Sequence, residues 1–384
     1  MLKKFFITQK IIFRGFDITK LKIILLEKID RFIIYHAGRS RKDLIRMVAI
    51  EEKTYPQLER AINPTHDIKL FAGRSNPKLA QEIADQLGTT VGPMVVKNFS
   101  DGEIYVQVKE SVRGDDVFII QPVCDPVNEN LMELLIIIDA FKRASAKTIT
   151  AVIPYYGYAR QDRKTSGREA ITAKLVADLL TTAGADRVLA MDLHTGQIQG
   201  FFNILVDHIF ATNVLVNYIK DLGISTDNMV AVSPDMGGAN RTRHFAKKLD
   251  IPIAIIDKRR DKHNEAIATN VIGDVEGKVC LMFDDIIDTA GTICEAAKLL
   301  KSKGAKDVYV GATHPVFSGP AVERLASAPI KECIVTNTIP LDMSKMPSNI
   351  KQISVAPLLA QAISRIHDDE SISSLFGFEK EMQV

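Results

Sequence analysis

The sequence predicts an α/β fold in which two similar domains each contain a parallel sheet. Short apolar runs of strand length alternate with segments of helical composition along most of the chain. One series of such elements, from Val117 to Ile153, is repeated in order and approximate spacing from Val279 to Ala312. With 384 residues, 46% of them hydrophobic and 25% charged, the chain is long enough to bury two cores.

The first 66 residues are predicted to form a basic N-terminal extension and a linker. Residues 1–50 carry 12 Lys and Arg against four Asp and Glu, whereas the net charge of the whole chain is only +2. The segment from Tyr55 to Asp67 contains two prolines and is typical of a linker. The folded body is therefore expected to begin near residue 67.

Three interpretations of this extension stay open. The first is an organelle-targeting peptide, and the second is a loosely ordered extension. The third is a start codon assigned too early, with Met47 as the true start. A basic, acid-poor leader is typical of targeting, but Ser40 is the only serine among residues 1–50. No apolar run approaches the ~18 residues that a membrane span requires. We expect a cytoplasmic protein without a membrane partner, with an organelle as the alternative location.

The body is predicted to divide into an N-terminal domain, residues 67–212, and a C-terminal domain, residues 213–384. The first elements expected are a strand from Ile68 to Ala72, a helix from Asn76 to Leu87, a strand from Val95 to Phe99 and a half-buried strand with Ile104, Val106 and Val108. The repeated series then begins with a strand from Val117 to Gln121, a helix from Asn130 to Ala144 and a strand from Ile149 to Ile153. Pro77 suits the first turn of its helix.

An acidic segment follows the strand expected from Val279 to Phe283. Asp284 and Asp285 are predicted to end that strand, and Asp288 comes three residues later. A turn of small residues leads into a helix expected from Ile293 to Gly304. The turn residues are Thr289, Ala290, Gly291 and Thr292.

This segment predicts a site for a phosphorylated sugar. Backbone N–H groups of a small-residue turn converge on an anion at the positive end of the helix. The carboxylates would repel a phosphate, so they suit sugar hydroxyls or the outer coordination of a divalent cation. Ordinary capping explains one Asp and one Thr, but not three Asp and two Thr. A DDxxD motif also occurs on the helices of all-α prenyl-transfer enzymes, but here a strand precedes it.

Three consecutive cations, Lys258, Arg259 and Arg260, follow the apolar strand expected from Ile251 to Ile256. Three cations on a mobile loop suit a clamp that closes over polyphosphate. A solvated basic loop would look the same in isolation. In combination with the acidic segment, we favour the clamp.

Four further residues are candidates for ligand binding, and each also has an ordinary structural explanation. His194 follows the strand expected from Val188 to Leu193, a position where most histidines are structural. Asp235 precedes a glycine pair that allows close backbone approach, although a simple turn explains it equally. Arg160 and Gln161 lie near aromatic residues and suit either a nucleotide or an interface.

The acidic segment resembles the phosphoribosyl-diphosphate loop of the type I phosphoribosyltransferase fold. Six motifs in order resemble ribose-phosphate pyrophosphokinases of the phosphate-activated type, over about Asp67 to Phe376. They are FSDGE (99–103), ARQDRK (159–164), DLHTGQIQGFF (192–202), VSPDMGG (232–238), KRR (258–260) and DDIIDTAGT (284–292). The resemblance implies two tandem type I phosphoribosyltransferase-like domains with parallel sheets. It also implies Mg²⁺-dependent transfer of the diphosphoryl group of ATP to C1 of ribose 5-phosphate, which releases AMP.

The resemblance further implies roles for individual residues. The ATP-binding residues would be Phe99, Asp101, Gly102, Glu103, Arg160 and Gln161, with Asp101 and Glu103 acting from a neighbouring subunit. The catalytic residues would be Lys258 and Arg260, and the magnesium-linked residues would be His194 and Asp235. Ribose 5-phosphate would contact Arg260, Asp284, Asp285, Asp288, Thr289, Ala290, Gly291 and Thr292. Transfer of this kind depends on positioning and charge neutralisation, so no nucleophilic side chain is needed.

Regulation and assembly are also implied by the resemblance. Inorganic phosphate would act as an activator, and phosphate or ADP would bind at an interface through Ser111, Arg113 and Ser371. The implied assembly is a homohexamer built from dimers. Ala170 stands where many members have a proline, and the basic pattern after Lys258 is shorter than in some members. The departure at Ala170 bears on the strength of regulation.

Two other classes of function compete with an enzyme. A non-catalytic regulatory subunit of the same fold would be expected to lose clamp or metal residues, and this chain keeps them. A transferase or transcriptional regulator that binds the diphosphate usually has one such domain and no FSDGE segment. Binding of nucleic acid is not expected, because residues after position 50 carry net negative charge. The four cysteines show no CxxC spacing and are predicted to be reduced core residues.

Overall fold

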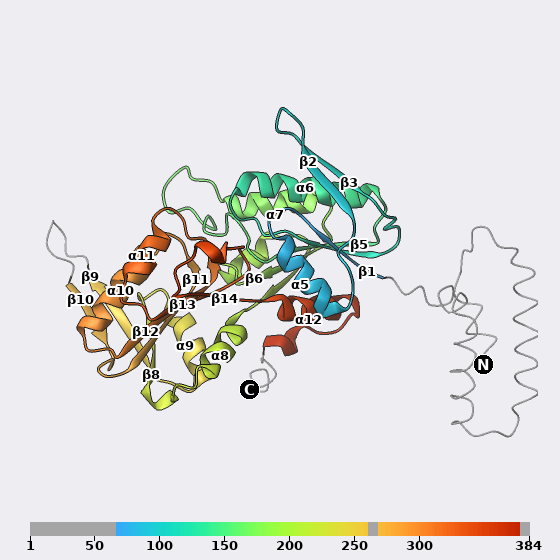
Figure 1. The fold of residues 1–384 in the computed structure, drawn as a ribbon. Coiled ribbons are helices and arrows are strands. Elements are labelled where there is room, and N and C mark those ends of the chain that lie inside the picture. The colour runs from blue at the N-terminus through green and yellow to red at the C-terminus, as the bar shows by residue number, and fades with distance from the viewer. Residues whose placement is uncertain (1–66, 260–267, 377–384) are drawn as a thin grey trace, which may run out of the picture. The chain divides into compact units, whose positions relative to one another are not determined.

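The computed structural model describes residues 67–259 and 268–376 (Figure 1). The chain divides into two units, Met1–Thr65 and His66–Val384, and the described elements all belong to the second. The predicted N-terminal extension and Arg260 lie outside the described residues. No helix in the described ranges is both long and apolar enough to cross a lipid bilayer.

The first sheet contains five strands, all parallel, in the order β1-β4-β5-β6-β7. The strands are β1 (Ile68–Ala72), β4 (Asp116–Ile120), β5 (Thr148–Ile153), β6 (Arg187–Met191) and β7 (Leu205–Ile209). The intervening helices are α5 (Pro77–Leu87), α6 (Val127–Arg143), α7 (Thr172–Ala183) and the short 3₁₀ helix η1 (Gly196–Phe201). The alternation of strands and helices predicted this parallel arrangement.

Side chains of this sheet alternate between its two faces, as a period of two residues requires. On one face, Phe71 and Ile119 share a core with α6 and α7. On the other face, Leu70 and Phe118 share a core with α5 and with α12 (Ala356–His367). Figure 1 shows α12 beside α5, so a helix from the end of the chain completes the first sheet's core.

Helix α5 shows how local sequence sets the ends of an element. The Asn76 side chain accepts a hydrogen bond from the Leu79 N–H at 3.2 Å, and Pro77 occupies the first turn. Gly88, with a φ of 65°, ends the helix in the left-handed region, where glycine carries no steric cost. The predicted helix is confirmed.

The second sheet contains seven strands in the order β10-β9-β8-β11-β12-β13-β14, parallel except for the antiparallel pair of β9 and β10. The strands are β8 (Met229–Ser233), β9 (Ile253–Arg259), β10 (Ala268–Ile272), β11 (Val279–Ile287), β12 (Asp307–Pro315), β13 (Glu332–Thr336) and β14 (Ile350–Ile353). The helices are α8 (Thr212–Asp221), α9 (Ala239–Leu249), α10 (Gly291–Ser302) and α11 (Ala321–Ser327), with 3₁₀ turns η2 (Thr226–Asn228), η3 (Met343–Lys345) and η4 (Ser373–Phe376).

Helices cover both faces of this sheet as well. Val230 and Cys280 share a core with α10 and α11, whereas Met229 and Leu281 share a core with α8 and α9. The four cysteines are free and buried, as predicted: Cys124, Cys280, Cys294 and Cys333. Burial raises the pKa of the Cys280 thiol to about 12, which keeps it protonated at neutral pH.

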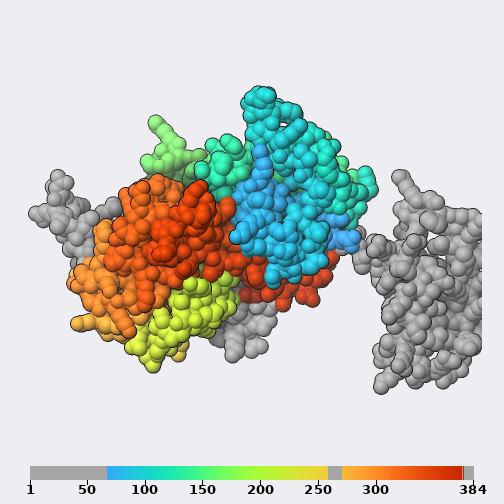
Figure 2. All heavy atoms as spheres, in the orientation of Figure 1, coloured from blue at the N-terminus to red at the C-terminus, as the bar shows by residue number. Residues whose placement is uncertain are grey.

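A separate two-stranded sheet is formed by the antiparallel strands β2 (Met94–Asn98) and β3 (Ile104–Val108). Val96 and Val106 at its base pack against the first core. Its tip, residues 99–103, stands out from the surface in Figure 2. The FSDGE motif therefore occupies an exposed hairpin turn.

The structure contains two α/β parts, each built on a largely parallel sheet, as the fold prediction required. The first sheet lies within residues 67–212 and the second within residues 213–384. Helix α12 belongs to the second range but packs on the first sheet. The division into two domains at residue 212 stays a proposal, and under it α12 belongs to the second domain by sequence but packs in the core of the first.

Candidate active site

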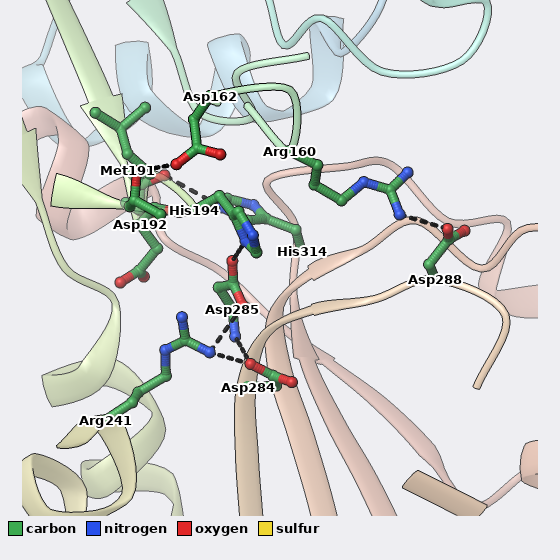
Figure 3. A network of polar contacts seen from close by, with 12 residues as sticks. Arg160, Asp162, Met191, Asp192, His194, Arg241, Asp284, Asp285, Asp288 and His314 are labelled. Carbon is green, nitrogen blue, oxygen red and sulfur yellow. Dashed lines mark hydrogen bonds and ion pairs between the residues drawn. The ribbon is translucent and has the colours of Figure 1, made fainter. Parts of the chain in front are cut away.

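The carboxyl ends of strands from both sheets meet at a group of charged side chains (Figure 3). His194 follows β6 and its Nδ1 lies 2.7 Å from the Asp285 Oδ2 of β11. Arg160 follows β5 and its Nη1 lies 2.6 Å from the Oδ2 of Asp288, just after β11. Ligands of open parallel α/β folds bind outside the carboxyl ends of the strands, so this junction is the candidate site.

Strand β11 runs through the two carboxylates that were expected to end it. Pairing with β12 continues past Asp284, and Ile286 lies opposite His314. Because β12 is equally long, it supplies backbone partners for an extension that the apolar run alone does not indicate. Asp284 and Asp285 are therefore fixed on a strand and not on a loop.

Asp285 is buried, with 6% of its surface exposed, and is held by His194 and Arg241. Besides His194, the Arg241 Nη1 lies 2.8 Å from its Oδ1. Burial alone would raise the pKa of Asp285, but the hydrogen bond from His194 and the charge of Arg241 outweigh it and hold the pKa well below its usual range. The same hydrogen bond raises the pKa of His194, against the effect of burial. Asp285 is thus a fixed anion.

Asp284 has a different electrostatic environment. Burial raises its pKa to about 7, the hydrogen bond with Asp285 adds to the rise, and Arg241 opposes it. Its side chain keeps 35% of its surface exposed, so water moderates the shift. Arg241 pairs with Asp284 as well as with Asp285. Two adjacent carboxylates therefore differ in their readiness to hold a proton.

The predicted phosphate turn, Asp288 to Thr292, lies directly after β11. Helix α10 begins at Gly291, two residues before the expected start, and its N-cap residue does not cap the first N–H groups through its side chain. Ala290 precedes it with a φ of 59°, a left-handed conformation that is uncommon outside glycine. Arg324 Nη1 donates to the Thr289 carbonyl at 2.9 Å and so fixes the turn to α11. No hydrogen bond among the described residues reaches the buried Asp288 Oδ1. Burial alone would raise the pKa of Asp288, but the nearby side chains of Ser318 and Arg160 hold it below its usual range. Uncapped N–H groups and an unpaired acceptor suit a phosphate and a hydroxyl.

The two predicted metal-linked residues, His194 and Asp235, lie on the turns after β6 and β8. Asp235 is exposed, and its Oδ1 accepts a hydrogen bond from the Gly238 N–H at 2.9 Å. Within the described ranges, no three His, Cys, Asp or Glu side chains gather closely enough to hold a metal. Mg²⁺ usually keeps several waters and shares substrate phosphates, so one exposed carboxylate fits such an ion. The arrangement suits a metal brought with substrate and not a protein-only cage.

The predicted ATP-binding residues fall into two separate places. Arg160 is at the site through Asp288, and the adjacent Gln161 Oε1 accepts a hydrogen bond from the Thr172 hydroxyl. Phe99 lies at the exposed hairpin tip with 50% of its surface exposed, and its ring contacts only the edge of Tyr105 among the described ring contacts. At that tip, the Asp101 Oδ1 accepts from the Glu103 N–H and Gly102 adopts a φ of 95°. No described contact brings this tip to the strand-end cluster.

The predicted clamp begins on a strand and not on a loop. Strand β9 continues through Arg259, with Lys258 opposite Thr269 of β10. The expected end at Ile256 is therefore wrong, because antiparallel pairing with β10 extends the strand through polar residues. Arg260 lies outside the described residues.

The predicted regulatory residues are not joined by any described contact. Ser111 and Arg113 are exposed on either side of the buried Val112, between β3 and β4. Ser371 follows α12, and its carbonyl accepts a hydrogen bond from Arg365 Nη1 at 2.8 Å. Their role in phosphate binding stays a prediction.

Three residues at the site escaped the sequence reasoning. Arg241 binds both strand-end carboxylates, Asp162 accepts a hydrogen bond from the Thr195 hydroxyl at 2.9 Å, and His314 bonds the backbone before His194. Arg241 had a usable signal, because it lies in the first turn of the helix that follows the glycine pair. His314 had none, since its partners in the first domain lie more than 120 residues away.

The chain contains two α/β domains, and an acidic strand end at their junction is followed by a turn of the size that binds phosphate. These features define a protein of the type I phosphoribosyltransferase class of fold. The family model for the N-terminal domain of ribose phosphate pyrophosphokinase matches residues 68–184. The phosphoribosyl synthetase-associated domain matches residues 261–377.

Relatives and a solved structure agree with these matches. The chain is 56% identical to ribose-phosphate pyrophosphokinase 2, chloroplastic, of Arabidopsis thaliana, over 86% of this chain and 85% of that relative. It is 58% identical to ribose-phosphate pyrophosphokinase of Nostoc sp., over 82% of this chain and 95% of that relative. The crystal structure of phosphoribosylpyrophosphate synthetase from Mycobacterium smegmatis matches with a TM-score of 0.74 at 48% identity, over 79% of this chain and 99% of that one. The chain belongs to the ribose-phosphate pyrophosphokinase family.

Proposed function

We propose that this enzyme transfers the diphosphoryl group of ATP to the C1 hydroxyl of ribose 5-phosphate. The products are 5-phosphoribosyl 1-diphosphate and AMP, for nucleotide biosynthesis. The observation that carries the proposal is the carboxyl end of β11, where the buried Asp285 and the half-buried Asp284 and Asp288 adjoin the start of α10. Family membership supports the same reaction.

Ribose 5-phosphate is proposed to bind at the end of β11. The 5-phosphate would accept hydrogen bonds from the first N–H groups of α10 and from the hydroxyls of Thr289 and Thr292. The unpaired Asp288 Oδ1 would accept a hydrogen bond from a sugar hydroxyl. Asp285 is already bound by His194 and Arg241, so it orients the site, whereas the exposed edge of Asp284 is available to the sugar.

ATP is proposed to bind across the junction, with Arg160, Gln161, His194 and Asp235 on this chain. Mg²⁺ would neutralise polyphosphate charge when bound. Asp235 offers an exposed carboxylate to that ion, and His194 keeps its Nε2 available because Nδ1 is occupied by Asp285. Lys258 and Arg260 would supply the positive charge that meets the transferring group.

The adenine-binding residues Phe99, Asp101, Gly102 and Glu103 are proposed to act on a neighbouring subunit. The exposed hairpin tip supports this, because residues that bind ATP within one chain would be expected near Arg160. A homohexamer built from dimers, activated by inorganic phosphate at Ser111, Arg113 and Ser371, is the assembly we propose. Light scattering with and without phosphate tests its size.

The location of the protein is a separate proposal. We retain the cytoplasm, with an organelle as the alternative. Two relatives from Arabidopsis thaliana carry the word chloroplastic in their names, which supports keeping that alternative. Fusion of residues 1–66 to a fluorescent protein, expressed in cells with plastids, distinguishes the two locations.

The proposed reaction is tested by the nucleotide product. The full chain is incubated with ATP, Mg²⁺ and ribose 5-phosphate, and the nucleotides are separated by chromatography. We expect AMP in equal amount to the sugar diphosphate, and no AMP when ribose 5-phosphate is left out. ADP as the main product would contradict the proposal, since it would indicate transfer of a single phosphoryl group.

A further inference from the structure

The turn that carries His194 has an unusual backbone. Asp192 follows β6 with a φ of 40°, a left-handed conformation that costs energy for a residue other than glycine. Its N–H donates to the Ile209 carbonyl at 2.9 Å, and the next N–H, of Leu193, donates to His208 Nε2 at 2.9 Å. A strained turn persists only where its surroundings hold it.

The second domain supplies part of that hold. The Nε2 of His314, on β12, lies 3.2 Å from the carbonyl oxygens of both Met191 and Asp192 (Figure 3). The hydroxyl of Thr313 donates to the Asp192 Oδ2 at 2.7 Å. Thr313 and His314 are buried, with 3% and 2% of their surfaces exposed. Two consecutive residues of one strand therefore bind the backbone and the side chain of one turn in the other domain.

The protonation of His314 follows from these partners. Both groups facing Nε2 are carbonyl oxygens, so Nε2 must carry a hydrogen, and Nδ1, 3.0 Å from the Thr338 hydroxyl, is the acceptor of a neutral ring. Burial lowers the pKa of His314, in keeping with that neutral form. The Thr336 hydroxyl donates to the Thr313 carbonyl at 2.7 Å, while the single hydrogen of the Thr338 hydroxyl is donated to His314 Nδ1. The histidine is thus fixed from its own domain.

The register of the second sheet connects this contact to the active site. His314 lies opposite Ile286, the residue after Asp285, on the neighbouring strand β11. Asp285 binds the imidazole of His194, while His314 binds the carbonyls two and three residues before it. Adjacent strands of the second sheet therefore hold both the side chain and the backbone of one turn of the first.

We propose that Thr313 and His314 are positioning residues that keep His194 in register with Asp285 across the two domains. Neither touches the proposed substrates. Their effect on the reaction rests on the proposed function, whereas their effect on the turn does not. The competing interpretation is an ordinary buried contact that adds stability and leaves His194 unaffected.

The test compares Thr313→Val with Thr313→Ser in the full chain. Valine has nearly the same shape and removes the hydroxyl, and the variant is expected to fold because the Asp192 carboxylate keeps the hydrogen bond from the Ala211 N–H at 2.9 Å. Serine keeps the hydroxyl. The control is Thr181→Val, which removes a hydroxyl that donates to the Ala177 carbonyl within α7. The readouts are melting temperature, kcat, KM for both substrates, and amide hydrogen exchange in peptides that contain residues 192–194.

Thr313→Val is expected to speed exchange in residues 192–194 and to lower kcat by about tenfold or more, because catalysis is sensitive to small misplacements. Thr313→Ser should keep both the exchange rate and kcat near those of the unchanged protein, and Thr181→Val should change neither. His314→Gln, which keeps an N–H donor, should be less impaired than His314→Leu. Normal exchange and normal kcat in Thr313→Val, with only a lower melting temperature, would overturn the proposal. If the unchanged protein forms no AMP, the proposed function fails, and hydrogen exchange alone decides the positioning role.

Discussion

The carboxyl ends of β4 and β11 occupy corresponding places in the repeated series, yet they contain opposite chemistry. After β4 the chain places Gln121, a neutral amide with 0% of its surface exposed. Its Oε1 accepts from the Ser75 hydroxyl at 2.6 Å, and its Nε2 donates to the Glu133 Oε1 at 3.1 Å. The last residues of β11 instead include Asp284 and Asp285, which bind Arg241 of α9 and, through Asp285, His194 of the other domain.

The difference shows how one architecture yields a structural strand end and a binding one. The polar atoms of Gln121 are satisfied by its own domain, and the close approach of Gly73 leaves no space there, since a Cβ on Gly73 would lie 2.2 Å from the Gln121 Oε1. At β11, within the part of the chain that the structure describes, no hydrogen bond reaches the Asp288 Oδ1, and the N-cap residue of α10 does not cap the helix through its side chain. Unsatisfied polar groups at a strand end, and not the fold alone, define the site.

Removal of Mg²⁺ is expected to have the largest effect. Substrate phosphates beside Asp235, Asp284 and Asp285 concentrate negative charge at the second strand end, and that charge requires a cation. Turnover should stop in excess EDTA and return when Mg²⁺ is restored, with an unchanged circular dichroism spectrum. Full activity in excess chelator would contradict the proposed cofactor.

Matched substitutions at the two strand ends should separate catalysis from stability. Asp285→Asn removes the anion that holds His194 and Arg241, and kcat should fall on the order of 10²-fold. Gln121→Leu should leave kcat near normal and lower the free energy of unfolding by about 1–3 kcal/mol, because Ser75 and Glu133 lose partners. Steady-state kinetics and urea unfolding measure both. Equal loss of kcat in the two variants would show that the strand ends do not differ in function.

The clamp and the sugar site should affect different kinetic constants. Lys258→Ala should lower kcat on the order of 10²-fold with little change in KM, since its charge would act mainly in the transition state. Lys258→Arg should also be impaired, because a planar guanidinium does not replace a point charge. Asp288→Ala should raise the KM for ribose 5-phosphate, because it removes an acceptor in the ground state and the partner of Arg160. Near-normal kcat in folded Lys258→Ala would make the basic segment a solvated surface.

Removal of the N-terminal extension should have the smallest effect. A chain that begins at Thr65 lacks none of the six motifs and keeps every described element of both sheets. We expect it to fold and to retain most of the activity, as measured by circular dichroism and AMP formation. An inactive or insoluble shortened chain, beside an active full chain, would place the extension in the core or the assembly.

Local sequence predicted the elements whose limits are set locally. Strand β1 matches its expected ends, and α5 begins and ends where Asn76, Pro77 and Gly88 indicate. The lengths of β9 and β11 could not be predicted this way, because each is extended by pairing with β10 or β12 beyond its apolar run. A strand's polar end is decided by its neighbour in the sheet.

The candidate site was predicted in its residues more than in its contacts. Asp284, Asp285 and Asp288 were visible as an acidic strand end, but their partners Arg241, His194 and Arg160 lie 43, 91 and 128 residues away. The pairs with His194 and Arg160 exist only after the two sheets meet, and the pair with Arg241 exists only after α9 packs beside β11. The contacts of the FSDGE hairpin cannot be predicted from local sequence either, since its proposed partner is another subunit.

The most direct test of the contrast between the two strand ends is amide hydrogen exchange with and without ribose 5-phosphate. If the end of β11 binds the sugar phosphate, the amides of Gly291, Thr292 and Ile293 should become protected at saturating ligand. The segment after β4, residues 122–129, should exchange at an unchanged rate. Protection after β4 without protection at the start of α10 would contradict the assignment of the sugar-phosphate site.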